Sequence, residues 1–157
     1  MDPMNRFHTS STWRLVRLES LIALGGLCYL IAAFSSDVRW SRFMLAFVLV
    51  DLIGYVPGAI AYRLAAARAV RGPVRIAAIF HHLYNLCHSF VTVAAVLALW
   101  FVASGEVEWA MLALPIHLLG DRGLFGNTYK PTSLPFEPAE TPASRLLADA
   151  RQGARLP

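Results

Sequence analysis

Three of the five histidines lie in one apolar stretch, from Phe80 to Phe90, together with a tyrosine and an asparagine. One side of a helix over this stretch would carry four polar residues within a sector of roughly 100°: His81, Tyr84, Asn85 and His88. An ionisable side chain at membrane depth costs a few kcal/mol or more, so it usually faces the interior of a helix bundle and marks a functional site. The stretch therefore predicts a buried polar site.

Two other apolar segments carry polar residues at a similar depth: Asp51, His117 and Asp121. At 1.5 Å per residue, Asp51 and His117 each lie about 12–14 Å from the outer end of their predicted helices. Asp121 follows His117 by one turn on the same face. Four antiparallel helices would therefore bring six polar residues into one layer between the membrane midplane and the cytoplasmic side: Asp51, His81, Asn85, His88, His117 and Asp121.

The chemistry that suits this layer is metal binding. Imidazole and carboxylate ligands suit zinc, iron or manganese, and helical spacings present such ligands inward from facing helices. The candidate ligands are His81, His88, His117, Asp51 and Asp121. The two aspartates are also the candidate catalytic residues, because a hydrolase would need a general base. Supporting groups around the metal would come from Tyr55, Tyr84 and Asn85.

Such a site predicts a membrane enzyme that acts on a lipid-soluble small molecule. Iron with dioxygen would make it an oxidoreductase of the hydroxylase or desaturase type, and zinc would make it a hydrolase. The alternative is a non-enzymatic membrane subunit, or a pathway for protons or small solutes, whose polar layer holds the helices together. Cys87 lies beside His88 in apolar surroundings, which favour an inert thiol over a nucleophile.

The composition indicates an integral membrane protein. Of the 157 residues, 57% are hydrophobic and only 15% are charged, and the apolar residues form runs of about the length that spans a bilayer. The net charge of +4 does not indicate a nucleic-acid partner, because the basic residues lie between hydrophobic runs without interleaved aromatic residues. The two cysteines also lie in apolar runs, which argues against a disulfide framework.

The predicted fold is an all-α polytopic membrane protein, an antiparallel bundle of four transmembrane helices. The predicted helices cover residues 17–34, 43–64, 76–102 and 109–123. A polar arm, 1–16, precedes the transmembrane domain, 17–123, and a proline-rich cytoplasmic tail, 124–157, follows it, with an amphipathic helix near 144–151. Gly54 and Gly58 have the spacing of a close helix-packing face, which could also serve a homodimer or a larger membrane complex.

The distribution of basic residues predicts the orientation. Arg39 and Arg42 lie in the first connection, whereas the other twelve of the fourteen Lys and Arg residues lie on the side of the termini. Because cytoplasmic segments carry the excess of basic residues, both termini should be cytoplasmic in the inner (plasma) membrane.

Three segments resemble an uncharacterised family of small four-helix bacterial membrane proteins. They are Asp51 to Tyr55, Tyr84 to Ser89 and His117 to Gly126, which match the family's Asp with a Gly-Tyr pair, its Tyr-Asn-x-x-His segment and its His-x-x-x-Asp-Arg segment in that order. The similarity spans about residues 45–130. The resemblance implies the four-helix fold and the choice of polar residues, but it implies no reaction.

Overall fold

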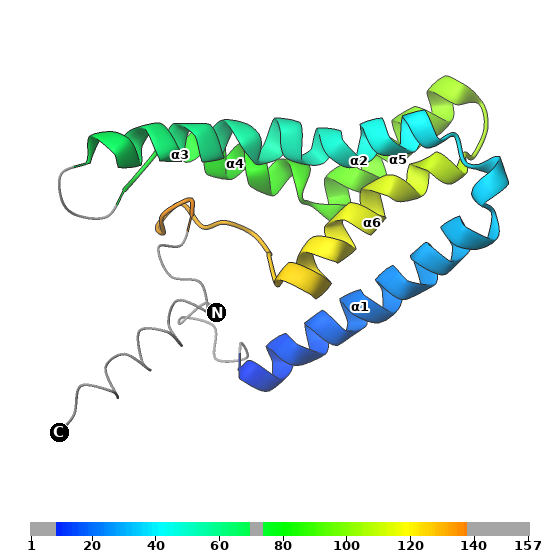
Figure 1. Cartoon of the computed structure of the whole chain (residues 1–157), viewed down its shortest axis with the longest axis horizontal. Coiled ribbons are helices and arrows are strands. Elements are labelled where there is room, and N and C mark those ends of the chain that lie inside the picture. Colours follow the sequence, from blue (N-terminus) through cyan, green and yellow to red (C-terminus); the bar gives the residue numbers. More distant parts are fainter. Residues whose placement is uncertain (1–8, 70–73, 138–157) are drawn as a thin grey trace.

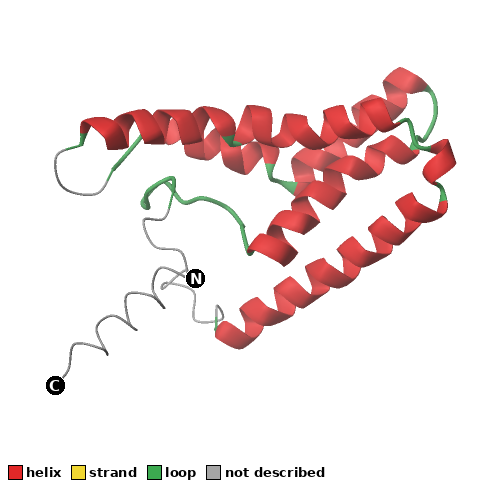
Figure 2. Ribbon diagram, in the orientation of Figure 1, coloured by secondary structure: helices red, strands yellow, loops and turns green. Residues whose placement is uncertain are grey.

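The computed structural model describes residues 9–69 and 74–137, and every regular element in these ranges is a helix. The elements are α1 (Ser10–Ala33), η1 (Ser35–Asp37), α2 (Trp40–Gly54), α3 (Val56–Arg68), α4 (Ala78–Cys87), α5 (Phe90–Ser104), η2 (Trp109–Leu112), α6 (Ala113–Gly120) and η3 (Asp121–Phe125). The prediction of an all-α chain is confirmed for these residues, and Figure 2 shows helices joined by short loops.

Two helical segments are long and apolar enough to cross a membrane, Ser10–Ala33 and Trp40–Arg68. The pair α4 and α5 would form a third crossing if its two halves, bent by 58°, are taken as one span. The side chains of α1 are largely exposed although they are apolar, as Leu18, Ile22 and Tyr29 show. Exposed apolar surface on a helix of this length is what a hydrocarbon environment requires.

The centre of the molecule is the helical run from η2 through α6 to η3. Figure 1 shows α6 between α1 and the α2–α3 segment; α4 packs beside α2, and α5 contacts α6. Ala110, Ala113 and Leu118 on this run are almost completely buried. Because small and apolar side chains face the neighbouring helices, the backbone of α6 can approach them closely. This run therefore carries His117 into the middle of the molecule.

The first helix begins earlier than the sequence indicated. A capping box between Thr9 and Thr12 satisfies amides at the helix start, so α1 begins at Ser10 and residues 10–16 belong to it rather than to a polar arm. The second helix begins at Trp40 rather than residue 43 and extends to Arg68. Its α2 and α3 halves meet at Tyr55, where Pro57 can donate no backbone hydrogen bond.

The prediction of one continuous helix over 76–102 is wrong, because the chain forms two helices, α4 and α5, with a break beside the site. The chain leaves the helix at His88, and the Ser89 hydroxyl accepts a hydrogen bond from the Val91 amide to begin α5. A serine that caps its own following turn competes with the continuous helix, which explains the break in an otherwise apolar run.

The fourth predicted helix, 109–123, is also irregular. It begins as a 3₁₀ turn, continues as α6 and ends in a π-helical turn that stops at Gly126, whose φ is +72°. Glycine adopts this left-handed conformation without strain. Residues 1–8, 70–73 and 138–157, which include the predicted amphipathic helix near 144–151, lie outside the described residues.

The two glycines of the predicted packing face are covered from within the chain. A Cβ atom at Gly54 would meet Cys87 Cβ at 2.7 Å, and one at Gly58 would clash with the ring of Phe136. The close packing predicted for them is present, but the contacts are with α4 and the segment after η3. The close contacts of Gly54 and Gly58 are therefore made within the chain.

A cluster of charged residues holds together the starts of α2 and η2. The carboxylate of Glu108 pairs with Arg42 and, at 3.1 Å, with Arg39, which also pairs with Glu106 at 2.8 Å. The Trp100 indole donates to Glu108 at 3.4 Å. These contacts place the two arginines of the first connection at one level with the start of the central helical run.

Candidate metal site

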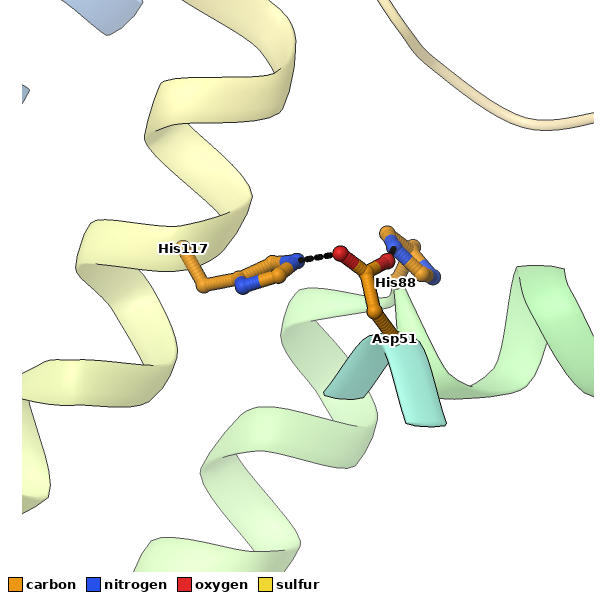
Figure 3. Close-up of side chains that lie close together, drawn as sticks. All are labelled: Asp51, His88 and His117. Carbon is orange, nitrogen blue, oxygen red and sulfur yellow. Dashed lines mark ion pairs between the residues drawn. The ribbon is translucent and has the colours of Figure 1, made fainter. Parts of the chain in front are cut away.

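Four side chains from three segments meet beside the central helical run, and we call them the His/Asp cluster: Asp51, His88, His117 and Asp121. The Nε2 atom of His88 lies 3.3 Å from Asp51 Oδ1 and 3.2 Å from Asp121 Oδ2. The Nε2 atom of His117 lies 3.6 Å from Asp51 Oδ2 and 3.7 Å from Asp121 Oδ2. Each imidazole therefore faces both carboxylates, and Figure 3 shows the Asp51 carboxylate between the two rings.

Local structure fixes the direction of each imidazole. His88 sits at the break after α4, where its Nδ1–H donates to the Tyr84 carbonyl at 2.9 Å and its ring stacks on Tyr84 at 3.9 Å. A carbonyl can only accept, so Nδ1 carries the proton and Nε2 is directed at the carboxylates. The His117 ring packs edge-on against Phe47 at 4.7 Å.

Several polar atoms of the cluster are buried without a hydrogen bond to any described residue. They are His88 Nε2, both ring nitrogens of His117, and Asp121 Oδ2. The Asp51 side chain is 46% exposed, in contrast to 16% for Asp121. Polar atoms buried among apolar helices are costly unless something pairs with them. The cluster thus presents buried nitrogen and oxygen atoms whose lone pairs a bound cation would use.

The spacing of the cluster is close to what a metal ion requires. One ligand atom from each of Asp51, His88 and His117 lies within 4.8 Å of the others. A tetrahedral ion at 2.0–2.1 Å from nitrogen or oxygen ligands holds them about 3.3–3.4 Å apart. The four carboxylate–imidazole distances, 3.2 to 3.7 Å, bracket that value. Two imidazoles and a carboxylate could therefore hold an ion with only small movements, and Asp121 would contact the same imidazoles.

The structure does not bring His81 to the cluster. His81 lies seven residues before His88, which is about 10 Å along the helix. Its Nε2 atom lies 3.2 Å from the Leu134 carbonyl, and its ring packs edge-on against Phe136. The sequence predicted this histidine as a candidate ligand. Its ring instead packs against the chain segment after η3.

Of the predicted supporting groups, only Tyr84 touches the cluster. The Asn85 amide donates to the Lys130 carbonyl at 3.0 Å and accepts from the Lys130 amide at 2.7 Å, so it holds the backbone of the segment after η3. Tyr55 stacks on Phe136, with ring centroids 6.0 Å apart.

The sequence did not indicate that the segment from Asn127 to Glu137 packs against the helices, because these residues were assigned to the proline-rich tail. Phe136 is 1% exposed and fills the notch above Gly58. The Lys130 ammonium donates to the Phe136 carbonyl at 2.6 Å and lies 4.2 Å from the centre of the Phe136 ring. Burial lowers the pKa of Lys130. Phe136, an aromatic residue in a polar, proline-rich stretch, was the feature of the sequence that could have indicated this packing.

Comparison with known protein families, curated proteins and solved structures finds no match to this chain. Its function must therefore be inferred from the geometry of the His/Asp cluster and from the membrane character of its helices.

Proposed function

We propose that the chain crosses the plasma membrane four times, with both termini in the cytoplasm, and that its His/Asp cluster binds one divalent transition metal. The four crossings would be α1, the α2–α3 segment, the bent α4–α5 pair and the run 109–125. At 1.5 Å per residue the last run rises by about 25 Å, close to the ~30 Å of a hydrocarbon core. Successive segments run in opposite directions in Figure 1, which supports this arrangement.

The observation that carries the metal proposal is the set of buried imidazole nitrogens that face two carboxylates without a hydrogen bond to them. Two ionised aspartates in an apolar bundle carry two negative charges, which a low-dielectric environment strongly disfavours. A divalent cation between them makes the cluster neutral and satisfies His88 Nε2 and His117 Nε2 together. The Tyr84 carbonyl then serves as the outer partner that orients His88, as in many metal sites.

The ligand types favour iron, zinc or manganese. Asp51, His88 and His117 form a set of two histidines and one carboxylate, which occurs in iron oxygenases and in zinc hydrolases. Asp121 stands beside both imidazoles, where it would act either as a fourth ligand or as the group that holds a proton. We propose an enzyme that acts on a lipid-soluble substrate, because the cluster lies among apolar helices.

A second candidate function follows from the same distances. If both histidines are protonated, each carboxylate has two imidazolium partners within 3.7 Å, and the cluster is again neutral. It would then hold α2, the end of α4 and α6 together in a non-enzymatic membrane component, or pass protons between them.

The metal content of the purified protein separates the two candidates. Protein without a polyhistidine tag, in mild detergent, should carry about one ion per chain by elemental mass spectrometry, and His88→Ala and His117→Ala should lose it. His82→Ala is the matched control, because this exposed histidine lies on the helix that leads to His88 but outside the cluster, and its loss should leave the metal in place. Folded wild-type protein without metal, even after supplementation, would leave only the structural or proton-handling function.

A further inference from the structure

An apolar groove of about 360 Å³ lies between α2 and α5, with Leu114 of α6 at its base. Arg42 and Trp100 line one end, and Ile53 and Cys87 line the other. Between these ends Thr92 is the only polar residue among the described residues of the lining. The groove is therefore a binding surface for a hydrocarbon rather than for a polar molecule.

The length of the groove matches one leaflet of a bilayer. From Arg42 to Ile53 the lining residues of α2 extend over about 16 Å at 1.5 Å per residue, and half of a ~30 Å hydrocarbon core is ~15 Å. Arg42 belongs to the charged cluster at the start of α2, so this end lies at the membrane interface. The groove runs from the interface to the middle of the membrane.

The volume suits one chain. An apolar cavity of about 150 Å³ holds benzene, so a groove of this size holds roughly twice as many carbon atoms or slightly more, a dozen or so. The Arg42 side chain remains half exposed beside its Glu108 partner and can contact a negatively charged or ester group at the interface.

The inner end of the groove is formed by neighbours of the His/Asp cluster. Val50 and Cys87 directly precede Asp51 and His88 in the chain, and all four lie where α2 meets the end of α4. Leu114 lies nearly one turn before the remaining histidine on α6. The groove therefore ends at the level of the cluster.

We propose that this groove binds one acyl chain of a membrane lipid, with the ester end at Arg42 and Trp100 and the distal carbons beside the cluster. This inference rests on the proposed function for the role of the cluster. The substrate would be a long-chain lipid that the protein recognises by its acyl chain. A cluster about 14 Å from the interface meets chain carbons rather than an ester. Ester hydrolysis is therefore not the reaction that this arrangement serves.

Photo-crosslinking tests the orientation of the chain. The protein is placed in phosphatidylcholine nanodiscs that contain a phosphatidylcholine with a diazirine either near the ester or near the methyl end of one chain. The ester-end probe should label peptides around Leu45 and Trp100, and the methyl-end probe should label peptides around Val50 and Cys87. Equal labelling of these sites and the exposed apolar residues of α1 by both probes would overturn the proposal.

Two filling variants and one control make the test specific. Val96→Phe and Leu49→Phe each add bulk to the groove lining and should reduce methyl-end labelling about tenfold, the effect of roughly 1.4 kcal/mol. Leu99→Phe adds bulk to an exposed position on α5 outside the groove and should change nothing. Helical circular dichroism and monodispersity identify folded variants. Crosslinks from groove residues to a second copy would show that a protein occupies the groove, and would also overturn the proposal.

The outcomes distinguish this proposal from the metal proposal. Val96→Phe should retain the metal, and His88→Ala should lose the metal but keep the labelling pattern. Chain labelling in a protein that binds no metal would refute only the proposed metal function. Metal binding without labelling of the groove would refute only the acyl-chain site.

Discussion

Replacing Gly54 by alanine should displace His88 and weaken metal binding. The new Cβ atom would lie 2.7 Å from Cys87 Cβ and 3.3 Å from His88 Cε1. Carbon atoms pack at about 3.5–4.0 Å, so the end of α4 must move away by about 1 Å. Cys87 Cβ is attached directly to the backbone and cannot avoid the clash by rotating. The movement would therefore reach the imidazole in the next residue.

The expected effect is larger on metal binding than on stability. Overpacking of this kind costs about 1–3 kcal/mol of folding free energy. Metal sites tolerate deviations of only about 0.2 Å in ligand distance, so a shift of ~1 Å should weaken binding at least as much as loss of an outer hydrogen-bond partner, about 10–100-fold. Metal titration monitored by elemental mass spectrometry would measure the affinity, and thermal unfolding in detergent would measure stability.

Two other glycines provide matched controls. Gly25 lies within α1, where an added Cβ atom would have nothing within 4 Å, so Gly25→Ala should keep the metal and gain a few tenths to about one kcal/mol of helix stability. Gly58→Ala would push against the Phe136 ring and should loosen the segment after η3 without moving the cluster. Wild-type metal affinity in folded Gly54→Ala would refute the view that this glycine positions His88.

Two further predictions concern the contacts that hold the ends of the molecule. Asn85→Leu should remove both hydrogen bonds to the Lys130 backbone, at a cost of about 2–3 kcal/mol, and speed amide exchange at Lys130 roughly 30–150-fold; unchanged exchange would contradict this role. Glu108→Gln should lower the unfolding midpoint by an amount equivalent to about 1–2 kcal/mol, because its buried carboxylate, 4% exposed, pairs with both arginines near the start of α2. Glu106→Gln, at a side chain 54% exposed, is the control. Equal shifts of the unfolding midpoint in both variants would contradict a larger role for the buried carboxylate.

Part of the candidate site was predictable from two numbers, the 3.6-residue period and the 1.5 Å rise of a helix. Those numbers placed Asp51 and His117 at equal depth, and put Asp121 one turn beyond His117 on the same face. The structure brings these three residues together with His88. Ionisable residues in apolar runs are few, so depth alone was enough to select these three residues.

The rest depended on contacts that local patterns do not contain. The helix break at Ser89 was hidden because the apolar run continues unbroken on both sides, and only the serine cap ends α4. His81 joined the predicted ligand set because it shares a helix face with His88. The packing of Phe136 against that face joins residues about fifty positions apart, and a composition-based tail assignment cannot anticipate it.

X-ray absorption spectroscopy of the zinc-loaded protein in detergent tests the central claim most directly. We predict one ion per chain with a first shell of nitrogen and oxygen at about 2.0–2.1 Å and outer scattering from two imidazoles, which becomes one imidazole or disappears in His117→Ala. A sulfur shell at about 2.3 Å would assign the metal to a cysteine instead, and no bound ion in folded protein would contradict the metal site altogether.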